Sequence, residues 1–110
     1  MSRNKSFNIN HFERSIFSFT DKQEKLILVR MPRKHVFDRI QEIQKIDIEN
    51  TGFDDFNEIL SGLLAEILSN NKAGKEITAQ SIMDDYDFEE RLEIINQYVD
   101  FVKGMTGDPN

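Results

Sequence analysis

The sequence predicts a mainly α protein of the α+β type, in which an N-terminal β-hairpin is followed by three main helices. Two short apolar runs rich in strand-forming residues lie at 15–19 and 26–31, and a polar connector separates them. Beyond residue 32, three longer segments repeat apolar residues every three or four positions, which is the period of an amphipathic helix. A length of 110 residues suits a single domain.

The chain divides into one domain with two flexible ends. Residues 1–14 are polar with scattered apolar side chains, and we expect a flexible arm that becomes ordered on contact with a partner. Residues 15–105 are expected to form the helical domain with its hairpin, and residues 106–110 a flexible tail. The arm residues that we interpret as partner-binding are Phe7, Ile9 and Phe12.

The hairpin is predicted from strands at Ser15–Phe19 and Leu26–Met31, joined by the polar loop Thr20–Lys25. A two-stranded hairpin is marginally stable by itself, so we expect it to lie on helices or on another copy of the chain.

The first helix is expected to follow Pro32, because proline suits the first turn of a helix, where a backbone N–H has no partner to lose. Asn50–Gly52 is expected to end the pattern. The apolar stripe of this helix is Val36, Phe37, Ile40 and Ile43, with Ile46 as an uncertain extension.

The central helix is predicted at Phe53–Leu68, which has the widest apolar face of the chain. Thr51 is expected to cap its start, and two aspartates in the first turn suit the helix dipole. Gly62 either allows the close approach of another helix or is tolerated on an exposed side. A loop is expected at Ser69–Lys75.

The third main helix is expected from Phe88 to Val102, with Gly104 ending it. Asp87 and Glu90 have the spacing of a capping box, in which each side chain accepts from the other's backbone N–H. The preceding segment, Glu76–Met83, fits either a short helix or an irregular clip.

The composition and motifs predict a protein that is not an enzyme and that has no cofactor. Cysteine is absent, which excludes disulfides, thiolate metal sites and cysteine nucleophiles. We expect no metal site, because the spacing of His35 and Asp38 is more typical of a solvated surface pair. Ile59–Leu68 is too short and too polar to span a membrane, so we expect a soluble intracellular protein without a membrane partner.

The acidic run at 84–90 alternates carboxylates in a way that is similar to the opening of a calcium loop. Glu90 stands where such a loop needs glycine, and Asn96 stands where it needs glutamate. The run is therefore interpreted as a helix start with charges that suit the helix dipole.

Charge is divided unevenly along the chain. Residues 1–45 carry ten Lys/Arg and five Asp/Glu, whereas residues 46–110 carry four and fifteen, so that charges near +5 and −11 give the net −6. Such opposite poles can attract a second copy or a charged partner. The acidic part disfavours nucleic acid as that partner. The partner-binding residues expected at the poles are Arg30, Arg33, Lys34 and Arg39 on the basic side, and Asp84, Asp85 and Asp87 on the acidic side.

The order of these elements resembles a tail assembly chaperone of long-tailed bacteriophages, of the type found in phages of Gram-positive hosts. The resemblance extends from Ser15 to Met105. Three features carry it: a short hairpin that enters a helix through Met31-Pro32-Arg33-Lys34, a Leu-rich helix that starts with Gly52-Phe53-Asp54-Asp55-Phe56, and Glu76-Ile77-Thr78 followed by an acidic stretch before a last helix at 87–102.

The resemblance implies a small, mostly helical protein that acts before the virion is complete. Such chaperones bind the long tape measure protein, keep its apolar helices soluble and are displaced as tail tube protein polymerises. They also self-associate in helical arrays, so the resemblance implies a homo-oligomer. It places the protein in the host cytoplasm and not in the mature virion.

A second interpretation comes from charge alone. A small acidic regulator or inhibitor can use its acidic part, here residues 46–110, to occupy a basic groove on another protein. Self-association that weakens with salt would favour the chaperone, and competition with nucleic acid for a host enzyme would favour the inhibitor.

Overall fold

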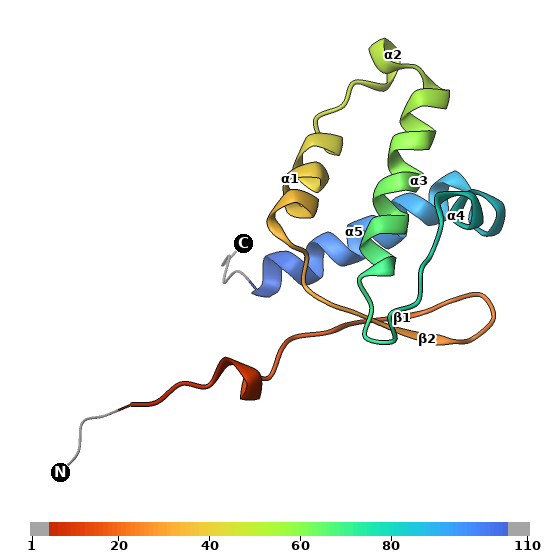
Figure 1. The fold of residues 1–110 in the computed structure, drawn as a ribbon. Helices are drawn as coiled ribbons and strands as arrows, with labels where there is room; N and C mark the ends of the chain where they lie inside the picture. The colour runs from red at the N-terminus through yellow and green to blue at the C-terminus, as the bar shows by residue number, and fades with distance from the viewer. Residues whose placement is uncertain (1–4, 106–110) are drawn as a thin grey trace.

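The computed structural model describes residues 5–105, and it is mainly helical with a small antiparallel sheet near the N-terminus (Figure 1). The predicted class, mainly helical with a small amount of strand, agrees with the structure, which has five α-helices within residues 5–105 where three main helices were predicted. The elements are a 3-10 turn η1 (Ile9–His11), strands β1 (Phe17–Thr20) and β2 (Leu26–Val29), and helices α1 (Lys34–Ile43), α2 (Ile48–Thr51), α3 (Phe53–Ser69), α4 (Ala79–Asp85) and α5 (Phe88–Met105).

The hairpin pairs β1 with β2 in a register that places Phe17 opposite Val29 and Thr20 opposite Leu26. Asp21 organises the turn, because its side-chain Oδ1 accepts from two backbone N–H groups of the loop, each at 2.9 Å. Both strands are shorter than predicted, and Thr20, which was placed in the loop, is the last paired residue of β1.

Helix α1 begins later than the sequence suggested. Arg33 is its N-cap residue and makes no side-chain capping bond, so Pro32 precedes the helix and the placement of Pro32 in the first turn was wrong. The helix ends at Ile43, and Ile46 packs half-buried on the core from the connection that follows. The short helix α2 in that connection was not predicted, because four residues are too few to show a helical period.

Helix α3 is the central element, and its start also differs from the prediction. Thr51 is the last residue of α2, and Gly52, at φ 92°, occupies the N-cap position without a side chain to offer. The expectation that Thr51 caps α3 was therefore wrong. A Cβ added to Gly62 would meet no atom within 4 Å, so Gly62 serves no close helix approach and is simply tolerated there.

The C-terminal part confirms the predicted capping box. The Asp87 N–H donates to Glu90 Oε1 at 2.8 Å, and the Glu90 N–H donates to Asp87 Oδ1 at 2.7 Å. The ambiguous segment Glu76–Met83 is helical only from Ala79, where α4 begins after its cap Thr78, and is irregular at Glu76–Thr78. Helix α5 continues through Gly104 to Met105, so Gly104 does not end it, because one glycine costs too little to stop a helix. The predicted tail at 106–110 lies outside the described residues.

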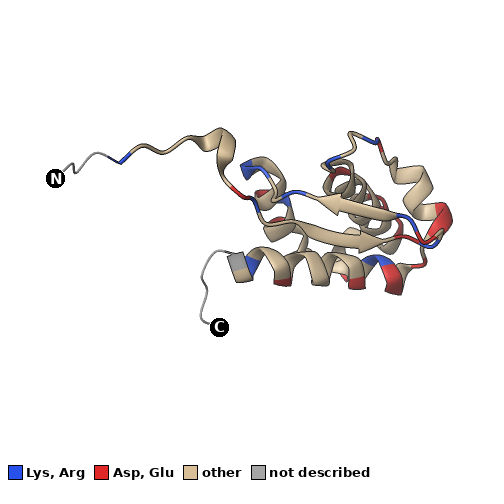
Figure 2. Ribbon diagram, turned by 90° about the horizontal axis from the view of Figure 1, so that it is seen from below, with Lys and Arg blue, Asp and Glu red and all other residues tan. Residues whose placement is uncertain are grey.

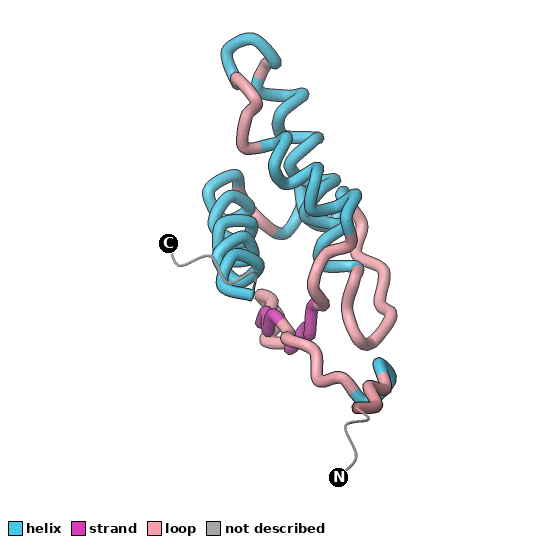
Figure 3. Tube along the Cα trace, turned by 90° about the vertical axis from the view of Figure 1, so that its left-hand side faces the viewer, coloured by secondary structure: helices cyan, strands magenta, loops and turns pink. Residues whose placement is uncertain are grey.

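The core lies between α3, α5, α1 and the inner face of the hairpin (Figure 3). Leu63, Leu64 and Ile67 on the apolar face of α3 are buried, whereas Leu92 on α5 is only half-buried. Its neighbour Arg91 takes the buried position instead, donating to Ser61 Oγ at 2.8 Å and to the Asn57 side chain. These hydrogen bonds satisfy the buried guanidinium. The apolar pattern of the sequence did not predict a buried cation at this position.

Replacing Leu64 by alanine should lower the free energy of unfolding by about 2–5 kcal/mol, because the fully buried side chain leaves a cavity in the centre of α3. Chemical denaturation monitored by circular dichroism measures the change. The matched control is Leu26→Ala, since Leu26 is 61% exposed and its truncation should change little. Equal effects of the two variants would contradict this core.

Candidate interaction groove at the end of the hairpin

The hairpin is held on the helical body by a short segment that follows α3. The Lys72 N–H donates to the Leu28 carbonyl, and the Arg30 N–H donates to the Asn70 carbonyl, both at 2.9 Å. Between them, Val29 and Asn71 form an isolated antiparallel bridge. The segment 70–72 therefore acts as a third strand at the C-terminal end of β2 and gives Arg30 a defined position.

Asn71 keeps this segment in place. It is buried, and its side-chain amide donates to the carbonyls of Leu68 and Lys75, both at 2.8 Å. Its Oδ1 accepts from the Lys75 N–H at 3.0 Å. One side chain therefore ties the end of α3 to the loop that runs towards α4, and all its polar atoms are satisfied.

Tyr98 fastens the same end of the hairpin to α5. The ring is buried and contacts Phe17 with 5.4 Å between ring centroids, and its hydroxyl donates to the Arg30 carbonyl at 2.8 Å. Burial raises the pKa of Tyr98 above its ordinary value, because the phenolate is disfavoured away from water. An ordinary tyrosine is already protonated at physiological pH, and the raised pKa extends the range in which this hydroxyl is a donor to more alkaline pH.

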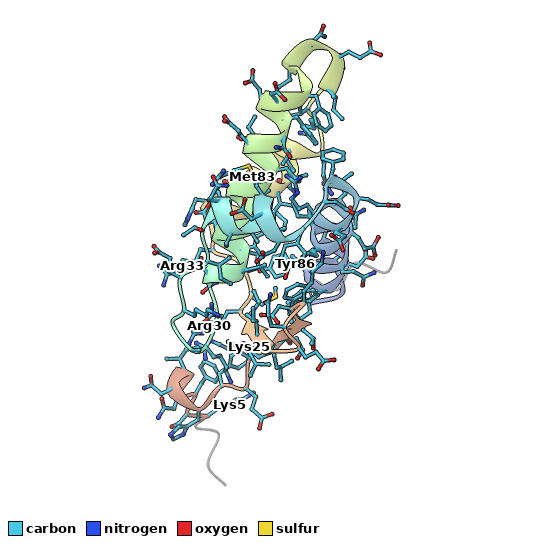
Figure 4. The ribbon with its side chains drawn as sticks, turned by 90° about the vertical axis from the view of Figure 1, so that its right-hand side faces the viewer. Lys5, Lys25, Arg30, Arg33, Met83 and Tyr86 are labelled. Atoms are coloured by element: carbon cyan, nitrogen blue, oxygen red, sulfur yellow. The ribbon has the colours of Figure 1, made fainter. Side chains whose placement is uncertain are left out.

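A groove of about 640 Å³ opens where the arm meets this end of the hairpin. It brings together residues that the sequence analysis had assigned to two separate features, the apolar arm and the basic patch. Figure 4 shows Arg30 between Arg33 and the arm residue Lys5. The lining residues are Phe12, Arg14, Ser15, Arg30, Met31, Arg33 and Asn70.

Three guanidinium groups at the groove lack a carboxylate partner within residues 5–105. Arg14 lies over the Phe12 ring at 5.5 Å, and Arg30 donates to the Asn71 carbonyl at 3.2 Å. Arg33 is exposed and has no ion pair in this part of the chain. Apolar rings beside unneutralised arginines are typical of a protein-binding surface for an acidic partner with exposed apolar side chains.

Two residues of the predicted basic patch lie outside the groove. Lys34 pairs with Asp38 within α1 at 2.8 Å, and Arg39 pairs with Glu66 on α3. Glu66 also contacts His35 Nε2 at 3.1 Å, so this histidine joins α1 to α3. The patch therefore divides into a structural part on α1 and an accessible part at the groove. Arg14, which sequence reasoning missed, lies in the groove instead; its only signal in the sequence was a cation two residues after the arm residue Phe12.

The arm projects away from the helical body (Figures 1 and 3). Phe7 and Ile9 are 70% and 52% exposed, and Phe7 contacts Phe12 with 6.2 Å between ring centroids. Large apolar side chains that gather in water without a covering element indicate an interaction segment.

The predicted acidic pole lies at the turn end of the hairpin, at the opposite end of the hairpin from the arm (Figure 2). Asp84 accepts from Gln80 at 2.9 Å, and Asp87 is engaged in the capping box. Lys22 pairs with Glu90 at 2.8 Å, and this contact lowers the pKa of Glu90 and raises the pKa of Lys22. Asp85 is exposed at the end of α4. Most acidic side chains of this pole therefore already form hydrogen bonds or an ion pair within the fold.

Within residues 5–105, no three His, Asp or Glu side chains are grouped closely enough to hold a metal ion. No helix of this part is long and apolar enough to cross a membrane. Comparisons with protein-family models, with curated proteins and with solved structures found no match to this chain.

The Tyr98 hydroxyl can be tested with Tyr98→Phe, which removes one hydrogen bond and leaves the ring. The free energy of unfolding at neutral pH should fall by about 0.5–1.5 kcal/mol. Because the folded pKa is raised, the contribution of Tyr98 is fully present below its ordinary pKa of about 10 and is lost as the pH rises further.

Denaturation of both proteins between pH 7 and 11 measures this dependence. The wild type should lose stability above pH 10 more steeply than the phenylalanine variant, in which other titrating groups are unchanged. Parallel pH profiles would show that Tyr98 does not carry the effect.

Proposed function

We propose that the protein is a tail assembly chaperone of a long-tailed bacteriophage. In this proposal it works in the host cytoplasm, binds the tape measure protein, keeps its apolar helices soluble, and leaves as tail tube protein polymerises. It is an interaction protein without catalysis, it forms a homo-oligomer, and it is absent from the mature virion. Nucleic acid and membranes are not among the proposed partners.

The groove and the arm beside it carry the proposal. Phe7, Phe12, Arg14, Arg30 and Arg33 place apolar rings and unpaired positive charge at one end of the molecule. A long helical partner with acidic and apolar faces is the kind of ligand that this surface suits, because apolar contact supplies affinity and charge sets orientation.

The experiment is co-expression with the tape measure protein encoded in the same phage genome. The wild type should raise the soluble fraction of the tape measure protein severalfold. Arg14→Glu/Arg33→Glu should remove most of that gain, because it reverses the charge at the groove. The matched control is Lys25→Glu/Lys45→Glu, which makes the same change in net charge at two exposed positions outside the groove.

A soluble fraction that does not respond to the wild-type protein would contradict the chaperone. Equal losses in the groove variant and in the control would show that net charge alone is responsible.

A second function, a small acidic regulator of a basic protein groove, is favoured by one observation. Asp85 and Glu89 are exposed at the α4–α5 junction, and neither has an ion-pair partner among residues 5–105. For this function, Asp85→Lys/Glu89→Lys would abolish competition with nucleic acid for a host enzyme, and the groove variant would retain it.

A further inference from the structure

A second exposed apolar surface lies at the opposite end of the molecule from the arm, where α2 leads into α3 (Figures 1 and 3). Phe53 is 54% exposed and Ile48 is 42% exposed. Phe53 also contacts the half-buried Phe88 at the start of α5, with 5.0 Å between ring centroids. We call Ile48, Phe53 and Phe88 the tip surface. Phe53 begins the helix that was predicted to have the widest apolar face, and the structure leaves more than half of its side chain in water.

The charged side chains that α2 and α3 contribute to the tip are all negative, and the nearby cation Arg91 is buried on Asn57 and Ser61. Residues 46–71 contain six Asp/Glu and no Lys or Arg. Glu49, Asp54, Asp55 and Glu89 are exposed on the helices that form the tip, and none has an ion pair within residues 5–105. An apolar patch with an acidic rim therefore lies at one end of the molecule, and an apolar groove with a basic rim lies at the other.

We propose that the tip surface of one copy binds the arm and groove of a second copy. In this contact, Phe53 packs among Phe7, Phe12 and Met31 of the other copy, and the aspartates of α3 meet its arginines. Charge complementarity selects a second copy as the occupant when no tape measure protein is bound, because both halves of the interface belong to the same chain. The proposal rests on the self-association included in the proposed function and names the surfaces that produce it.

The tip surface fits this role better than the acidic pole at 84–90. Charged side chains that are exposed to water contribute little affinity, so a stable contact needs apolar area. Apart from Phe88 and Glu89, which belong to the tip, the pole offers no large apolar side chain that is exposed, and Asp84, Asp87 and Glu90 already make local hydrogen bonds or ion pairs. The tip combines exposed apolar area with carboxylates that have no ion pair.

The geometry makes the contact heterologous, since different surfaces of the two copies meet. Because the arm and the tip lie at opposite ends, each copy can bind one neighbour at each end, and the association continues into a chain or a ring. Two complementary variants follow from this geometry: Phe7→Ser/Phe12→Ser lacks a working arm, and Phe53→Ser/Asp55→Lys lacks a working tip.

Sedimentation velocity of the purified proteins tests the proposal. The wild type should form species larger than a dimer as its concentration rises, and each variant alone should be monomeric. An equal mixture of the two should give a dimer and nothing larger, because one intact arm meets one intact tip. Leu26→Ser, at an apolar position that is exposed elsewhere, should associate like the wild type. A monomeric wild type, or a mixture that remains monomeric, would overturn the proposal.

Crosslinking gives an independent measurement, since the natural chain contains no cysteine. An equal mixture of Asn10→Cys and Glu49→Cys proteins should form a disulfide-linked heterodimer on mild oxidation, in excess over both homodimers. Replacing the tip variant by Gln41→Cys, on the exposed side of α1, should remove that excess. Homodimers in excess over the heterodimer would overturn the head-to-tail contact.

Solubilisation of the tape measure protein is measured separately on the same variants. If both variants are monomeric and their equal mixture does not form the expected dimer, the arm-to-tip contact is contradicted and the proposed function is not. Failure of the wild type to solubilise the tape measure protein would sink the proposed function, and the self-association data would still stand.

Discussion

The attachment of β2 to the segment that follows α3 is the constraint on which the rest of this structure depends. A two-stranded hairpin has little stability of its own, and here it gains a short third strand from residues 70–72 and a hydroxyl donor from Tyr98. Both contacts meet at Arg30, the residue from which the chain enters the first helix. The position of the groove, the exit of the arm and the start of α1 all follow from this junction.

The fold decides which charged side chains are available to bind a partner. The cations near the N-terminus separate into those that tie α1 to itself or to α3, such as Lys34 and Arg39, and those that remain available at the groove. The acidic residues also form two groups. Asp87 and Glu90 cap a helix or form an ion pair, whereas the carboxylates at the tip have no ion pair within residues 5–105. The two proposed binding surfaces, the groove and the tip, contain charged side chains that have no ion pair within residues 5–105.

Local signals predicted the parts of the fold whose energetics are local. The strand composition predicted the hairpin, and the spacing of apolar residues predicted α3 and α5. The spacing of Asp87 and Glu90 predicted a capping box, and both of its hydrogen bonds are formed. Signals that depend on a single residue failed more often. Pro32, Thr51 and Gly104 were each assigned to a helix end that lies one or two residues away, because helix ends fray and a single residue does not fix them.

By itself the sequence determined the mainly helical class with its N-terminal hairpin, the apolar faces of the long helices, the opposite charges of the two parts and the exposed apolar residues of the arm. The tertiary structure alone decided which of these features meet. It brought Arg14 and Phe12 beside Arg30 and Arg33, and it placed Phe53 at a solvent-exposed tip. The physical reason is that burial and ion pairing depend on contacts between residues far apart in the chain, and a helical period shows which face is apolar but not what covers it.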